Sequence, residues 1–217
     1  MPLYTLPVSL NTTVHKLGDL ARITDSYITV GTYKGNVNIA LLFSDKGNVL
    51  GEYAAVHKPP FRNQTPGFDH VVFSTDIGDI GTLLCYDGVG AKTAREFAKN
   101  GAQILVSMSN DNHFLETIEP ELHLGQDILR AVENRRYIVR AAPSGISAII
   151  DPYGRVLNKS EVRKEQVVFG KVTARKEKTL FTENGDVLSP LTLVILLLVI
   201  ASSATKGRYS KKEIRAN

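Results

Sequence analysis

The order of strands, turns and helices constrains the fold of this chain more than any other feature of the sequence. Residues 37–53 and 145–157 each place two apolar strands around a turn, Asp-Lys-Gly-Asn in the first and Asp-Pro-Tyr-Gly in the second, and so predict hairpins. Residues 90–108 and 122–141 each predict a helix that leads into a buried strand. Hairpins mixed with helix-to-strand units indicate an α/β or α+β sandwich, and not a doubly wound sheet of parallel strands alone.

Shorter patterns add a helix and several strands to this outline. They predict a helix over 13–22, a strand over 27–33, a strand–turn–strand unit over 70–87 and a last strand over 166–172.

Length and composition are those of one sizeable globular domain, with 217 residues of which 43% are hydrophobic and 22% charged. Much of the net charge of +4 lies in the last twelve residues, so the rest of the chain is nearly balanced and gives no sign of nucleic-acid binding. A single cysteine excludes an internal disulfide. Because we find no metal-ligand spacing, phosphate-binding glycine loop or nucleotide fingerprint, we expect neither a metal nor a cofactor.

An uncharged run, LSPLTLVILLLVIASSA over 188–204, is followed at once by a basic cluster. A spanning helix needs about 20 apolar residues, with roughly 17 as the lower limit. A buried core helix is the alternative, but the run is apolar on every face. We therefore predict a transmembrane helix over 188–205 in the cell membrane. The positive-inside rule then places a tail over 206–217 in the cytoplasm and the main domain, 1–187, outside it.

The only cysteine, Cys85, lies in TLLCYDG, where an apolar strand meets a sharp turn before a helix that begins near Ala91. One interpretation is a small buried side chain at the end of a core strand, which is the usual role of a lone cysteine. The other is a nucleophile at the sheet edge. The backbone N–H of Tyr86 would then face the developing oxyanion, and the helix N-terminus would lower the thiol pKa.

A longer series of motifs favours the nucleophile. The chain contains, in order, VNIALLFSDKGNVLGEY, GDIGTLLCYDG, AREFAKNGAQILVSMSND, RAVENRRYIVRAAPSGISAIIDPYGRVL and TLFTENGDVL. On these motifs, residues 27–187 resemble the carbon–nitrogen hydrolase (nitrilase) superfamily, and within it most closely the nitrilase-like domain of the apolipoprotein N-acyltransferases. The resemblance implies an α-β-β-α sandwich.

The resemblance also implies a chemistry in which a glutamate is the general base, a lysine stabilises the tetrahedral intermediate and a cysteine forms the acyl-enzyme. The cysteine carries over as Cys85, and the acidic residue that follows it as Asp87. Asn110 and Asp111 end a strand on the same side as Cys85 and are expected to line the pocket with Tyr86.

The other family positions depart from the pattern. Aligning YAAVHKPPF places Ala55 at the lysine position, and PFRN places Asn63 at that of a further acidic residue. Leu3 stands where the general base is expected, and the first strand–helix unit of the family is missing, so the chain is expected to be N-terminally truncated. Lys58 is a tentative replacement for the lysine, although in a regular strand it would face the opposite side from Ala55.

Three interpretations stay open on the sequence. The first is acyl chemistry through a cysteine thioester, as an N-acyltransferase or amidase acting on an acyl donor such as a phospholipid or a small amide. It needs a substitute base, for which the candidates are Glu52, His113, Glu116, Glu119, Glu121 and His123. The second is a catalytically inactive, membrane-anchored binding or interaction domain, which Leu3 and Ala55 favour. The third is a product too incomplete to fold stably. The resemblance also allows a homodimer.

Overall fold

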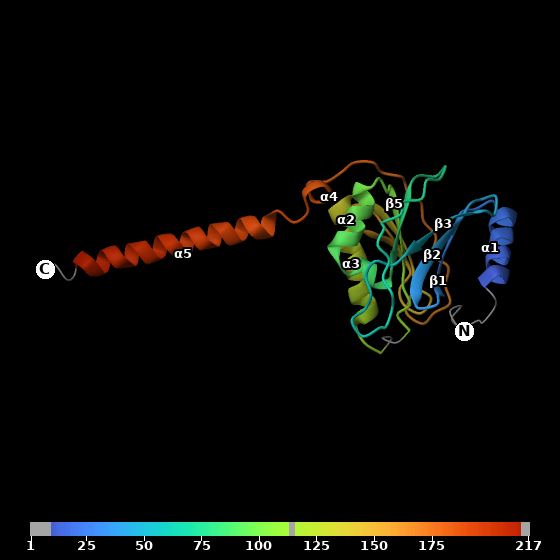
Figure 1. The fold of residues 1–217 in the computed structure, drawn as a ribbon, viewed down its shortest axis with the longest axis horizontal. Coiled ribbons are helices and arrows are strands. Elements are labelled where there is room, and N and C mark those ends of the chain that lie inside the picture. The colour runs from blue at the N-terminus through green and yellow to red at the C-terminus, as the bar shows by residue number, and fades with distance from the viewer. Residues whose placement is uncertain (1–9, 113–115, 214–217) are drawn as a thin grey trace. The chain divides into compact units, whose positions relative to one another are not determined.

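The computed structural model describes residues 10–112 and 116–213, and the side chains of 12–112 and 116–202. The chain divides into two compact units, Met1–Glu183 and Asn184–Asn217. The first unit is built in four layers, a helix, two sheets and a pair of helices (Figure 1). The α-β-β-α sandwich predicted from the sequence is therefore confirmed.

The first sheet is an antiparallel meander of β1 (Ile28–Lys34), β2 (Val37–Phe43) and β3 (Val49–Ala54). Alternation along β2 places Ile39, Leu41 and Phe43 on one face, where they pack against Ala21 of α1 (Leu10–Thr24). Residues 40 and 42 point the other way, into the core between the two sheets. The predicted hairpin over 37–53 is thus present, and the continuous apolar run of β2 is what allows this sheet to be covered on both faces.

The second sheet has the order β4-β5-β6-β7-β8. Its strands are β4 (Ile80–Leu84), β5 (Ile104–Met108), β6 (Tyr137–Ala141), β7 (Ala148–Ile150) and β8 (Val156–Lys159). The pairs β4–β5 and β5–β6 are parallel, whereas β6–β7 and β7–β8 are antiparallel. The carboxyl ends of the three parallel strands therefore meet at one edge of the sheet, and the residues that follow them converge there.

Two helices cover the outer face of the second sheet. α2 (Ala91–Lys99) packs on β4, and α3 (Glu119–Asn134) packs on β6 and β7. A short 3-10 helix, η2 (Cys85–Gly88), joins β4 to α2, and α4 (Leu180–Asn184) lies near the end of this unit. Both helix-to-strand units that the sequence predicts are therefore present.

Two predicted strands are not formed as expected. Residues 166–172 have no regular secondary structure, and the side chain of Asn158, not a strand ladder, donates a hydrogen bond to the carbonyl of Phe169. Val167 and Phe169 are 75% and 74% exposed, so the β-branched run lies where its side chains face solvent. In the unit predicted over 70–87, the first strand is reduced to a single bridge between Phe73 and Ile80.

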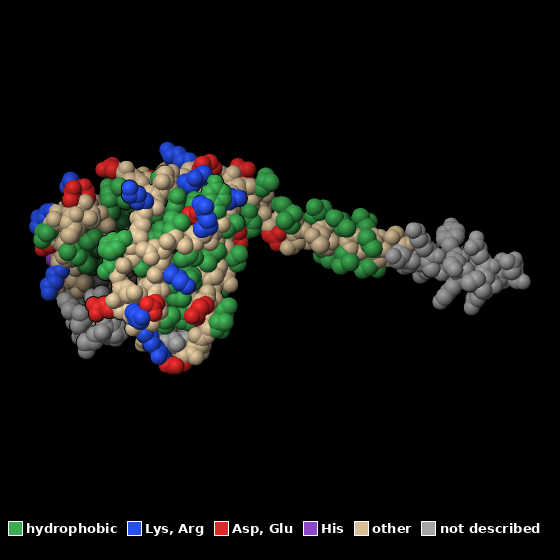
Figure 2. Space-filling model, turned by 180° about the vertical axis from the view of Figure 1, so that it is seen from behind, with side chains coloured by type: hydrophobic (Ala, Val, Ile, Leu, Met, Phe, Trp, Pro, Cys, Tyr) green, Lys and Arg blue, Asp and Glu red, His purple; other side chains and the backbone are tan. Residues whose placement is uncertain are grey.

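The predicted transmembrane helix is wrong. Within the described residues, no helix is both long and apolar enough to cross a membrane. α5 (Leu188–Glu213) carries hydrophobic side chains along the described part of the face that Figure 2 shows, but Thr192 and Ser202 bound the continuous apolar stretch. That stretch is the nine residues 193–201, or about 14 Å of helix, against roughly 30 Å of hydrocarbon. The extracytoplasmic placement of the main domain rests only on that helix.

Candidate active site

Cys85 is the first residue after β4, at the edge where the parallel strands end. Its φ of 50° lies in the left-handed region, which costs a residue other than glycine about 1–2 kcal/mol. The strain accompanies an abrupt change from an extended Leu84 into η2, where Asp87 and Gly88 are buried while Cys85 stays half-buried. A backbone bent in this way lifts the side chain of Cys85 out of the line of the strand.

The surroundings of the thiol disfavour its ionisation. Burial, and then the negative charge of Asp111, raise the pKa of Cys85. A hydrogen bond from the backbone N–H of Tyr86 acts in the opposite direction without outweighing them. The Tyr86 N–H therefore lies beside the sulfur, but the charged groups that the described residues bring to the thiol, Asp111 and Glu119, are both acidic.

Asp87 is fully buried and accepts its hydrogen bonds from neutral groups, while Nδ1 of the His57 ring lies 3.7 Å from its carboxylate. One carboxylate oxygen accepts hydrogen bonds from the hydroxyl of Tyr53, at 2.8 Å, and from the backbone N–H of Leu84, at 3.1 Å. The other accepts one from the backbone N–H of His57, at 2.9 Å. Burial, and then the charge of Asp87, raise the pKa of Tyr53, so the phenol stays a donor. Asp87 thus connects residues 84–88, which we call the Cys85 turn, to β3 and the loop after it.

Asp111 lies on the other side of Cys85 and is bonded to cations. One of its carboxylate oxygens is 3.0 Å from a guanidinium nitrogen of Arg140. The other terminal nitrogen of the same guanidinium is 2.7 Å from a carboxylate oxygen of Asp127. The second oxygen of Asp111 accepts a hydrogen bond from Ser109 and is 3.1 Å from Nδ1 of His123. Burial raises the pKa of Asp111, but these partners outweigh burial and hold the pKa below its usual range.

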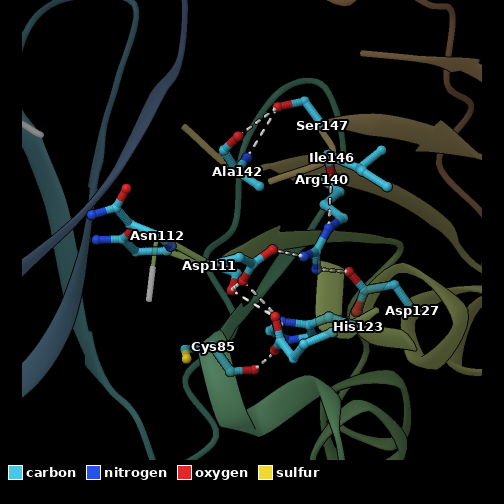
Figure 3. Close-up of polar contacts among 12 residues, drawn as sticks. Cys85, Asp111, Asn112, His123, Asp127, Arg140, Ala142, Ile146 and Ser147 are labelled. Carbon is cyan, nitrogen blue, oxygen red and sulfur yellow. Dashed lines mark hydrogen bonds and ion pairs between the residues drawn. The ribbon is translucent and has the colours of Figure 1, made fainter. Parts of the chain in front are cut away.

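His123 joins this group to the Cys85 turn. It comes from the first half of α3, and its Nε2 lies 3.2 Å from the backbone carbonyl oxygen of Cys85. In Figure 3 that carbonyl points toward His123, while the sulfur points to the opposite side. Asp111, His123, Asp127 and Arg140, which we call the ion-pair cluster, are all buried. They come from α3, β6 and the segment after β5.

Asp111, Glu119 and His123 each bring a ligand atom within 4.8 Å of the others, a spacing that could accommodate a cation. Asp111, however, is already paired with Arg140, and both ring nitrogens of His123 have partners. The arrangement is that of an ion-pair network and not of a metal centre.

The family model for the carbon-nitrogen hydrolases matches residues 3–179. The chain belongs to the carbon–nitrogen hydrolase family. This confirms the resemblance seen in the sequence motifs.

Curated relatives of this carbon–nitrogen hydrolase include apolipoprotein N-acyltransferases. The one from Geobacter metallireducens is 30% identical over 173 residues, covering 70% of this chain and 33% of the relative. Apolipoprotein N-acyltransferase 1 from Treponema denticola is 31% identical over 206 residues, covering 82% of this chain and 38% of the relative. The chain therefore spans about a third of the length of these relatives.

Solved structures of low identity share the fold. A carbon–nitrogen hydrolase from Helicobacter pylori has a TM-score of 0.65 at 19% identity, over 73% of this chain and 65% of that one. An amidase from Nesterenkonia sp. AN1, in which acrylamide had added to the active-site cysteine, has a TM-score of 0.62 at 22% identity. That comparison covers 84% of this chain and 74% of the amidase.

The positions that depart from the family pattern differ in exposure. Ala55 is buried just after β3, with its backbone N–H bonded to Asn38, whereas Lys58 and Asn63 are exposed in the loop that follows. Leu3 lies outside the described residues. The structure therefore brings Tyr86, Asp111 and Cys85 together but leaves Lys58 on the surface.

The substitute bases named from the sequence are also scattered. Glu52 pairs with Lys34 and Glu116 with Arg163 at the surface, and Glu121 is exposed. His113 lies outside the described residues. Glu119 and His123 alone among the described candidates lie near the site, and their carboxylate and ring are 3.5 Å apart. Burial, and then the charge of Asp111, raise the pKa of Glu119.

Sequence reasoning missed Asp127 and Arg140. A signal for Arg140 was present, because it stands two residues after Ile138 on a predicted strand and so shares its buried face. A charged residue at such a position needs a buried partner. Its two carboxylate partners could not be identified without the fold.

Proposed function

We propose that the chain is a cysteine-dependent acyl-transfer enzyme in which Cys85 is the nucleophile. The observation that carries the proposal is the geometry of Cys85, a half-buried thiol at positive φ, lifted from the end of β4 with the N–H of Tyr86 beside it. Family membership supports it, as do relatives named N-acyltransferases and the acrylamide adduct on an amidase's active-site cysteine.

The reaction follows from these groups. The thiol of Cys85 gives up its proton as its sulfur attacks the carbonyl carbon of the acyl donor, and the carbonyl electron pair moves to oxygen, beside the Tyr86 N–H. Collapse of this intermediate expels the leaving group, which takes up the proton lost by the thiol, and leaves a thioester on Cys85. An amine then attacks the thioester and releases the thiol, so that the acyl group ends on nitrogen. Water in place of the amine gives hydrolysis.

The acyl donor is proposed to be a phospholipid or a small amide. The names of the relatives favour nitrogen over water as the acceptor. Asn110 and Asp111 belong to the segment after β5, at the same sheet edge as Cys85, and are proposed to line the pocket.

A second function is favoured by two observations, the raised pKa of Cys85 and the buried Ala55 at the position that the family resemblance gives to the lysine. A thiol that stays protonated, without a cation for the oxyanion, suits a domain that keeps the fold and binds an acyl compound without transferring it. The two functions predict different covalent chemistry at Cys85.

The test uses intact-mass spectrometry of the purified chain. Wild type and Cys85→Ala are incubated with a short acyl thioester and, separately, with phosphatidylethanolamine in detergent micelles, with or without methylamine. Acyl transfer predicts one acyl mass on wild type, its removal by hydroxylamine and by methylamine, and none on Cys85→Ala. Because Cys85 is the only cysteine, the variant removes every thiol.

Binding of the acyl compound to both proteins without an adduct would replace the first function with the second. An adduct of equal yield on both proteins would show reaction at another group and would contradict the role of Cys85.

A further inference from the structure

The hydrogen bonds of His123 require more than one ring proton. Its Nδ1 is 3.1 Å from a carboxylate oxygen of Asp111, and its Nε2 is 3.2 Å from the carbonyl oxygen of Cys85. Both partners are acceptors, and a neutral imidazole carries a single N–H. Ser109 also contacts Nδ1, at 3.1 Å, but its hydroxyl hydrogen is directed to Asp111. Only the imidazolium form donates to both partners at once.

Charge balance in the ion-pair cluster leads to the same protonation state. Arg140, Asp111 and Asp127 are each at most 2% exposed. Without a proton on His123 they leave one buried negative charge uncompensated, and a charge without a partner is costly in the interior. A proton on His123 brings the cluster to neutrality, and among the described residues the half-exposed Glu119 is a further acidic group facing the ring.

The effects on the ring's own ionisation can be ordered. Burial is the largest and lowers the pKa of His123, and the charge of Arg140 acts in the same direction. The hydrogen bond to Asp111, with the charges of Asp111 and Asp127, outweighs both, so that the pKa of His123 is raised.

We propose that His123, as an imidazolium, is a positioning residue that holds the Cys85 turn, residues 84–88, by donating one hydrogen bond to the Cys85 carbonyl and another to Asp111. The turn needs such support because Cys85 adopts a left-handed φ that its own backbone disfavours. On the opposite side, Asp87 holds the same turn through Leu84. The proposal deepens the proposed function, because the turn presents both the thiol and the Tyr86 N–H to a substrate.

The sign of the pH dependence follows from the raised pKa. A group whose pKa is raised on folding stabilises the folded protein fully at a pH below its pKa in the unfolded chain, which is about 6.5 for histidine. This stabilisation is lost as pH rises through the pKa in the folded protein. The support from His123 is therefore complete in mildly acidic solution and weakens at alkaline pH.

Amide hydrogen exchange of the full-length protein tests the proposal without requiring catalysis. The peptide covering 82–90 is followed from pH 6 to pH 9, and its rates are corrected for intrinsic exchange at each pH. Two variants separate the two bonds. In His123→Gln the amide nitrogen can replace Nε2 and reach the Cys85 carbonyl, whereas in His123→Asn it replaces Nδ1 and reaches only Asp111.

At pH 6 we expect the exchange rate of this peptide in His123→Gln to stay within about twofold of wild type. In His123→Asn we expect the peptide to exchange about five- to tenfold faster, because about one net hydrogen bond is lost. Corrected protection in wild type should fall as pH rises, and that in His123→Gln should not. A peptide covering β1 and β2 is the control for global stability.

Equal protection in His123→Asn and wild type, or a wild-type profile independent of pH, would overturn the proposal. Equal loss in both variants would show that the shape of the ring, and not its bond to Cys85, holds the turn. The wild-type profile decides the matter even if a variant does not fold. Because exchange needs no substrate, a failure of the acyl-transfer proposal is seen separately, in the mass experiment.

Discussion

Asp87 and Asp111 are both buried carboxylates beside Cys85, but neutral donors hold the first and cations hold the second. Asp87 accepts from the Tyr53 hydroxyl and from two backbone N–H groups. Asp111 faces Arg140 and His123. Hydrogen bonds from neutral donors do not titrate near neutral pH, whereas the bonds to His123 depend on its proton. The hydrogen bonds on the Asp87 side of the Cys85 turn therefore need no titrating proton, although the His57 ring lies 3.7 Å from Asp87, whereas those on the Asp111 side depend on the proton of His123.

The largest effect is expected from removing the cation shared by Asp111 and Asp127. Arg140→Met leaves two buried carboxylates with only His123 to balance them, and should lower the free energy of unfolding by about 3–5 kcal/mol. Urea unfolding at pH 7 measures it. The matched control is Arg22→Met, whose exposed pair with Asp19 should be worth less than about 1 kcal/mol. Similar losses of unfolding free energy in Arg140→Met and Arg22→Met would show that the buried ion pairs stabilise the fold no more than an exposed pair.

A smaller effect is expected on the Asp87 side. Tyr53→Phe removes one of three donors from a buried carboxylate and should cost about 1–3 kcal/mol. Tyr33→Phe, which loses only an exposed bond with Gln64, is the control and should stay within about 0.5 kcal/mol of wild type. Because the bond is to a neutral donor, the cost of Tyr53→Phe should be the same at pH 6 and pH 8 when it is measured in a His57→Gln background, which removes the ring 3.7 Å from Asp87. A cost that changes with pH would remove the distinction between the two carboxylates.

The pH dependence of stability sharpens the same distinction. The raised pKa of His123 predicts that wild type loses about 1 kcal/mol as pH rises from 6 through the folded pKa, and that His123→Gln does not. The lowered pKa of Asp111 acts in acidic solution. Its stabilisation of the folded protein is present above the unfolded-state pKa of about 4 and is lost as pH falls through the folded-state pKa. Urea unfolding midpoints measured from pH 3 to pH 9 give both the loss at alkaline pH and the loss at acidic pH. Parallel profiles for wild type and His123→Gln would contradict the account.

The smallest effect is expected from Lys58→Met. Its side chain is exposed, where water and salt screen its charge, so the yield of acyl-enzyme should stay within about twofold of wild type. A loss of a hundredfold or more would mean that substrate binding brings Lys58 to the oxyanion, as the tentative sequence assignment requires.

The sequence predicted the sandwich because its hairpins and helix-to-strand units follow local rules, such as the apolar run of β2 and the turn that ends it. The same rules predicted a strand at 166–172 that did not form, because a β-branched run becomes a strand only where a neighbouring edge is available to pair with it. At the site, the position of Cys85 could be expected from the strand before it. The partners of Asp111 could not, since residues 123 and 140 reach it only through the packing of α3 and β6.

The central claim is that Cys85 is presented by the fold but is not ionised by it. The most direct test is a titration of the thiolate in wild type by its ultraviolet absorbance, with Cys85→Ala as the blank, since no other thiol contributes. Burial and the charge of Asp111 predict a pKa of Cys85 above the ordinary value of about 8.5. A pKa below 7 would contradict the account, because it would mean that a cation or a base already activates the thiol in the free protein.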